Sequence, residues 1–156
     1  MTEDAKFEDG REKPLNIGAL DTDDLNIVSS LTQDAVFPIT EMKWDAKSRR
    51  FGLLLNRFRW EDAGKGRHAP ERVQSVLAFD YVQSVASQGI DRSDKDMILS
   101  LLSVTFEPGE DCAGDVILTL AGDGGIRLRV EAIEATLKDV TRPYVAPSKS
   151  APHHDD

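Results

Sequence analysis

Two arginines and a tryptophan near the middle of the chain are the residues whose types and spacing best suit a binding site. Arg57 and Arg59 lie two positions apart in a stretch with strand character, so their guanidinium groups are expected on one face of the strand. Two such groups can hold a phosphate or carboxylate bidentately, and Trp60 follows directly. We therefore predict a candidate binding surface at Arg57, Arg59 and Trp60. The sequence leaves open the alternative that both arginines pair with carboxylates of this acidic chain.

The other reactive or metal-ligating residues lack the neighbours that catalysis or metal binding requires. Asp91, Asp94 and Asp96 do not follow the spacing of a calcium loop, so we expect them to act in turns. His68 lies in a Gly/Lys/Arg loop, and no serine of the chain has the sequence of a nucleophile elbow. The sequence therefore predicts no catalytic residue, no metal site and no cofactor. We also expect no catalytic or metal-binding role for the single cysteine, Cys112, for the glycine-rich segment at 122–125, or for the pair His153–His154 near the end of the sequence.

Charge and hydrophobicity exclude several classes of partner. The chain has 156 residues, of which 40% are hydrophobic and 30% are charged, and its net charge is -9. An acidic surface disfavours nucleic acids and anionic membranes alike, so we expect neither as a partner. The sequence has no apolar run long enough for a bilayer, no signal-peptide pattern and one cysteine. These features predict a cytoplasmic protein.

The chain divides into one domain and two tails. Residues 1–13 are mostly charged and hold one large apolar residue, Phe7, so we predict a disordered acidic tail there. Residues 14–144 are predicted to form a single β-rich domain. Residues 145–156 contain Pro, Ser and His and are predicted to be a second disordered tail.

Alternation of apolar side chains predicts most elements of the domain as strands. Residues 51–60 form the densest apolar run and are expected to be a central strand with both faces covered in its first half. A turn at 45–49 predicts a hairpin with the preceding segment, and the glycines at 122–125 predict a second hairpin between strands at 116–120 and 126–130.

Helical patterns occur at both ends of the domain. Asp21 can cap a helix that continues to about Val36. At 131–140 the spacing of Ile133, Leu137 and Val140 favours a second helix, although alternation through Ile133, Ala135 and Leu137 leaves a strand open. The fold class is therefore α+β: a bent antiparallel sheet or small barrel with an N-terminal-side helix and a C-terminal helix. The specific architecture that we expect is a pleckstrin-homology-like barrel.

Six stretches of the domain carry a likeness to a known family: residues 55–61, 75–80, 88–91, 99–102, 106–109 and 130–134. Together they resemble an uncharacterised alphaproteobacterial family, classed as a domain of unknown function (family 2948). The likeness covers about Leu15 to Tyr144. It implies a bacterial, cytoplasmic protein and transfers no activity, ligand or site residue.

Small size, a basic-aromatic strip and the lack of a catalytic motif favour a non-enzymatic protein-interaction or adaptor module. The alternative is a binder of, or an enzyme acting on, a small anionic metabolite, with Arg57 and Arg59 in its pocket. A third possibility is a homo-oligomer that associates through the aromatic end of the central strand.

Overall fold

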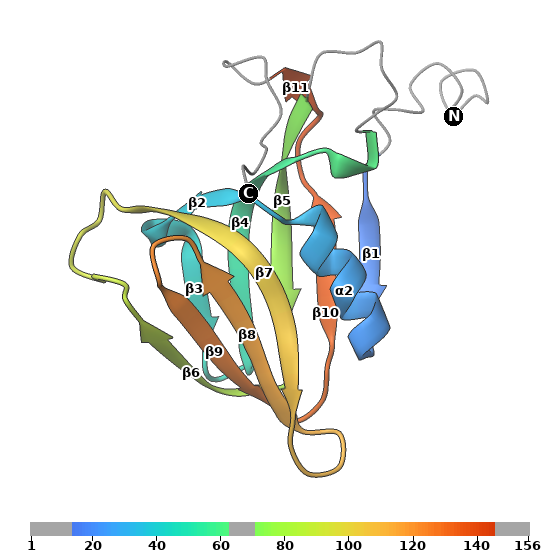
Figure 1. The fold of residues 1–156 in the computed structure, drawn as a ribbon, viewed down its shortest axis with the longest axis vertical. Helices are drawn as coiled ribbons and strands as arrows, with labels where there is room; N and C mark the ends of the chain where they lie inside the picture. Colours follow the sequence, from blue (N-terminus) through green and yellow to red (C-terminus); the bar gives the residue numbers. More distant parts are fainter. Residues whose placement is uncertain (1–13, 63–70, 146–156) are drawn as a thin grey trace.

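The computed structural model describes residues 14–62 and 71–145. The two predicted tails lie outside the described residues, apart from Val145. His68, His153 and His154 also lie outside them. The described chain is a large antiparallel sheet with one α-helix (Figure 1). Along the sheet the strand order is β1-β10-β5-β4-β2-β7-β8-β9-β6, with β3 paired to β4 and β11 paired to β5. The strands are β1 (Asn16–Ala19), β2 (Val36–Pro38), β3 (Met42–Asp45), β4 (Arg50–Phe58), β5 (Glu71–Phe79), β6 (Val82–Gln88), β7 (Ile98–Pro108), β8 (Gly114–Leu120), β9 (Gly125–Val130), β10 (Ala135–Asp139) and β11 (Tyr144–Val145).

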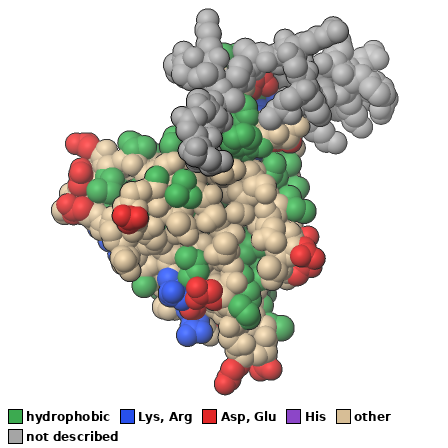
Figure 2. Space-filling model, viewed as in Figure 1, with side chains coloured by type: hydrophobic (Ala, Val, Ile, Leu, Met, Phe, Trp, Pro, Cys, Tyr) green, Lys and Arg blue, Asp and Glu red, His purple; other side chains and the backbone are tan. Residues whose placement is uncertain are grey.

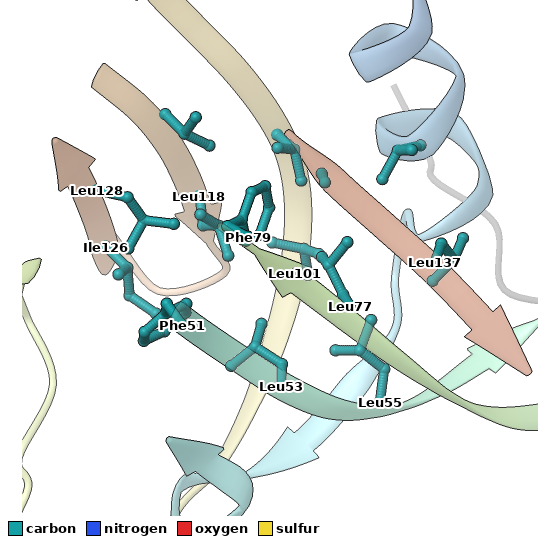
Figure 3. Packing of buried hydrophobic residues seen from close by; sticks show 14 of the residues in the cluster. Phe51, Leu53, Leu55, Leu77, Phe79, Leu101, Leu118, Ile126, Leu128 and Leu137 are labelled. Atoms are coloured by element: carbon teal, nitrogen blue, oxygen red, sulfur yellow. The ribbon is translucent and has the colours of Figure 1, made fainter. Parts of the chain in front are cut away.

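The sheet bends so that its two halves enclose one core. The short strand β2 joins the halves because it pairs with both β4 and β7. The inward side chains of β4, β5 and β10 meet those of β7, β8 and β9 in a single cluster (Figure 3). Phe51 and Phe79 are paired across β4 and β5, and each is 1% exposed. The core therefore depends on contacts between strands that are far apart in sequence.

The sheet is not closed into a barrel. Its strand order ends with β1 on one side and β6 on the other, and these two strands do not pair in the part of the chain that the structure describes. The predicted small barrel and its pleckstrin-homology-like form are therefore wrong, whereas the bent antiparallel sheet is confirmed. The chain changes from one half to the other between β5 and β6, at a bend where Tyr81 has a φ of 59°.

The helix α2 (Thr22–Leu31) begins where its capping residue predicted. The Asp21 carboxylate accepts a hydrogen bond of 2.8 Å from the backbone N–H of Asp24, which satisfies one free donor of the first turn. Leu25 and Val28 are fully buried, and the helix lies against β7 and β1. None of the described helices combines the length and the hydropathy needed to cross a membrane.

The predicted C-terminal helix is wrong, because residues 135–139 form the strand β10. Its apolar positions fit both periods, but Ala135, Leu137 and Asp139 are all buried on one face, as a strand requires. The strand lies between β1 and β5 and pairs with both. A helix there would leave the edges of two strands without hydrogen-bond partners, so the tertiary context decides in favour of the strand.

Candidate functional site

Arg57 lies at the end of β4, on the face that points into the core. Its side chain has no exposed surface, and its guanidinium donates two hydrogen bonds of 2.8 Å to the Glu61 carboxylate. A second carboxylate, that of Asp139 on β10, accepts from the same guanidinium at 3.1 Å. The Ser75 hydroxyl completes the group, since it donates to Asp139 at 2.6 Å and accepts from Arg57 Nε at 3.1 Å. We call Arg57, Glu61, Ser75 and Asp139 the arginine cluster.

Arg59 and Trp60 follow the end of β4 and also bond within the chain. Arg59 is 3% exposed, and its Nη1 donates to Glu71 at 2.8 Å. The Trp60 indole N–H donates to the carbonyl oxygen of Gln33, just beyond α2, at 2.9 Å. Its ring meets that of Phe58 edge to face, with the centroids 4.7 Å apart. The donors described here, on Arg57, Arg59 and Trp60, therefore bond to acceptors of the same chain.

The charges of the arginine cluster stabilise one another. Burial opposes the charged form of Arg57, but the hydrogen bonds from Arg57 to Glu61, together with the negative charges of Glu61 and Asp139, raise the pKa of Arg57. Burial would raise the pKa of Glu61, but the hydrogen bonds and positive charge of Arg57 lower it below 4.5. The Ser75 hydroxyl donates a hydrogen bond to the Asp139 carboxylate, which is also paired with the Arg57 guanidinium. The cluster is suited to joining β4, β5 and β10.

The lowered pKa of Glu61 predicts a loss of stability in acid. Because the folded-state pKa lies below the unfolded-state pKa, the stabilisation is complete above about pH 4.5 and is lost as the pH falls through the folded-state pKa. We expect urea unfolding to show a smaller acid-induced loss in Glu61→Gln than in the wild type. The exposed Glu110→Gln serves as the control and should follow the wild type. An equal acid-induced loss in Glu61→Gln and in the wild type would show that Glu61 does not carry this dependence.

Two of the three predicted turn aspartates accept hydrogen bonds within their own loop. Asp91 accepts hydrogen bonds from the backbone N–H and the hydroxyl of Ser93, and Asp94 accepts from the N–H of Asp96. Within residues 14–62 and 71–145, no three His, Cys, Asp or Glu side chains are grouped so that they could hold a metal ion. On the face in Figure 2, acidic side chains lie at separate places, several of them along the rim. The charge on that face is therefore spread out.

The terminal strand β6 is a second candidate site. Among the described strands it pairs with β9 alone, and its seven residues include no charge and no proline. The register with β9 shifts between Val82 and Ser84, and the Val82 N–H donates to the carbonyl of Arg49, so the regular part of the edge is 84–88. Edge strands are usually shortened, charged or interrupted by proline, because their free N–H and C=O groups can pair with another chain. The opposite terminal strand, β1, is short, with four residues.

A hollow lies on the outer face of the sheet beside this edge. Its volume is about 270 Å³, and its lining includes Ala86 on β6, Ile117 on β8, and Gly125 and Arg127 on β9. Ala86 is paired with Arg127, which is paired with Ile117 on its other side, so these three side chains form one row across three strands. Gly125, which has no side chain, lines the hollow beside this row. Its volume is below the roughly 300–1,000 Å³ of small-molecule sites.

This edge was not among the residues predicted from the sequence, although the sequence carries a signal for it. Residues 82–90 contain no charge in a chain that is 30% charged. That composition is compatible with an edge that accepts another strand, but period-two alternation alone does not separate an edge strand from an inner one.

Comparison with known proteins gives one result. The sequence model of the family described as "Protein of unknown function (DUF2948)" matches residues 15–154. Neither the search of curated proteins nor that of solved structures gives a match.

Proposed function

We propose, for a chain that belongs to the DUF2948 family of proteins of unknown function, a role as a non-enzymatic protein-interaction module. It binds an extended segment of another protein by adding that segment to the sheet beside β6. The observation that carries this proposal is the uncharged terminal strand, which pairs on one side only among the described strands. In strand addition, main-chain hydrogen bonds supply affinity and neighbouring hollows supply specificity.

The buried arginines support this choice over a metabolite site. A pocket for an anionic metabolite needs guanidinium groups that face a ligand, whereas Arg57 and Arg59 donate to Glu61, Asp139 and Glu71 of their own chain. In the proposal these two residues and Trp60 hold the end of β4 in place. The partner contacts the other half of the sheet. A cytoplasmic location in a bacterial cell, as the sequence predicts, is compatible with this role.

Peptides selected from a displayed random library on the full chain test the proposal. We expect selected peptides to change the amide resonances of residues 84–88 and to lose binding when alternate backbone nitrogens of the peptide are methylated, because methylation removes the main-chain donors. The double variant Ser84→Lys/Ala86→Lys should weaken binding by about tenfold or more, since charged edges resist strand pairing. Peptides that bind without affecting β6, or that tolerate methylation at every position, would contradict the proposal.

The other terminal strand provides the matched control. Asn16 and Gly18 on β1 are exposed like Ser84 and Ala86, so Asn16→Lys/Gly18→Lys adds the same two charges at the far edge of the sheet. This double variant should bind the selected peptides as the wild type does. An equal loss in Asn16→Lys/Gly18→Lys would mean that added charge, and not the β6 edge, determines binding.

A further inference from the structure

The lining of the hollow beside β6 includes an apolar residue, Ile117, and a cationic one, Arg127, together with the polar residues Ser87, Gln88 and Asp123. The side chain of Ile117 lies on the outer face of β8 and is partly exposed in the hollow. Its neighbours on that face of the strand, Asp115 and Thr119, are polar. Arg127 lies between Ile117 and Ala86, and 51% of its side chain is exposed although it pairs with Glu107 and Asp115. An exposed guanidinium beside an apolar surface suits the face of an aromatic ring.

We propose that this hollow receives an aromatic side chain of the segment that adds to β6, and that the segment is basic. This inference rests on the proposed function and names the chemistry of its partner. The methyl group of Ala86 is small enough for a long side chain of the added segment to lie across it. Gly125, which has no side chain, leaves space for that side chain in the hollow. An aromatic ring there contacts Ile117 and stacks on Arg127, whereas a short side chain leaves the hollow unfilled.

Charge and side-chain size favour such a partner over a second copy of this chain. The net charge of -9 repels an identical chain and attracts a basic one. Exposed Asp91 and Asp123 lie in the turns beyond the end of β6, where a basic residue of the partner would meet them. A second β6 strand would offer only Ser84, Ala86 and Gln88 on its outer face, and none of these carries an aromatic ring. The occupant is therefore an extended basic segment with one aromatic residue.

Two peptides with one difference test the side-chain preference. The peptide Lys-Thr-Val-Xaa-Val-Thr-Lys is made with Trp or Ala as Xaa and titrated into the labelled full chain, with the amide resonances of residues 84–88 as the readout. We expect the Trp peptide to bind about tenfold more tightly than the Ala peptide, since buried aromatic residues dominate binding energy. Equal affinities at β6 would overturn this inference and leave strand addition intact. No change at β6 with either peptide at millimolar concentration would overturn both proposals.

The variant Gly125→Leu fills the hollow from within. An added Cβ at Gly125 would lie 3.6 Å from the carbonyl oxygen of Leu118, an ordinary contact, so the backbone can accept the side chain. The advantage of Trp over Ala should fall to about twofold or less in this variant, while the affinity for the Ala peptide stays unchanged. Gly125→Ser, with a smaller side chain, should reduce the advantage of the Trp peptide over the Ala peptide by less. It serves as the test if leucine at this position disturbs the fold. A full Trp advantage in both variants would place the ring elsewhere. Concentration-dependent dimerisation that changes the same amides would identify a second copy as the occupant and overturn the inference.

Discussion

Replacing Asp139 by alanine is expected to lower the free energy of unfolding by about 3–5 kcal/mol. The side chain of Asp139 is 1% exposed and that of Arg57 has no exposed surface, so the substitution removes one of two carboxylates from a fully buried guanidinium. It also removes the acceptors of the Ser75 hydroxyl and of the Leu15 backbone N–H. Urea unfolding of the variant and of the wild type at neutral pH measures the difference.

Two further variants separate the lost charge from a general effect of substitution. Lys138→Ala alters the exposed neighbour on the same strand and should change stability by less than about 0.5 kcal/mol. The double variant Arg57→Leu/Asp139→Ala should be more stable than Asp139→Ala alone, because it removes the buried charge that the single substitution leaves under-compensated. A double variant as unstable as the sum of the two single variants would contradict this account.

Phe51→Ala is expected to cost about 3–5 kcal/mol, since it leaves a cavity where the two halves of the sheet meet. Phe51 lies opposite Phe79, and in Figure 3 it points toward Ile126 on β9 of the other half. Chemical denaturation measures the change. The double variant with Phe79→Ala should lose less than the sum of the two single losses, because the paired rings share one space.

A second apolar residue provides the control for this prediction. Ile98 at the start of β7 is 60% exposed, so Ile98→Ala should cost less than about 0.5 kcal/mol. A similar cost for the two substitutions would mean that Phe51 does not bridge the halves in solution.

The parts of the fold that depend on local sequence could be predicted. The Asp21 cap, the alternation in β8 and β9 and the glycines between them each specify their element within a few residues. Residues 131–140 could not be assigned because their apolar positions satisfy helical and strand spacing together. The choice depends on the free edges of β1 and β5, which the chain brings together only in the folded state.

The sequence predicted which side chains share a face with Arg57, but not what that face meets. Arg57 shares a face with Phe51, Leu53 and Leu55, as the two-residue period requires. That face proved to be the core. One of the two carboxylates that compensate the buried charge of Arg57, that of Asp139, lies 82 residues away in sequence. Spacing along one strand places side chains on a face, but the identity of the face depends on residues from other strands. For the same reason, the position of β6 at the end of the sheet, among the strands that the structure describes, became visible only with the strand order.

The position of β10 between β1 and β5 has a consequence for synthesis. The strand β1 can pair only after β10 has left the ribosome. Until then the edges of β1 and β5 that face β10 lack their hydrogen-bond partners, and Arg57 lacks the carboxylate of Asp139. A nascent chain stopped before Ala135 should therefore remain sensitive to protease, whereas a chain that has emerged beyond Asp139 should resist it. The domain can therefore be completed only after β10 has emerged.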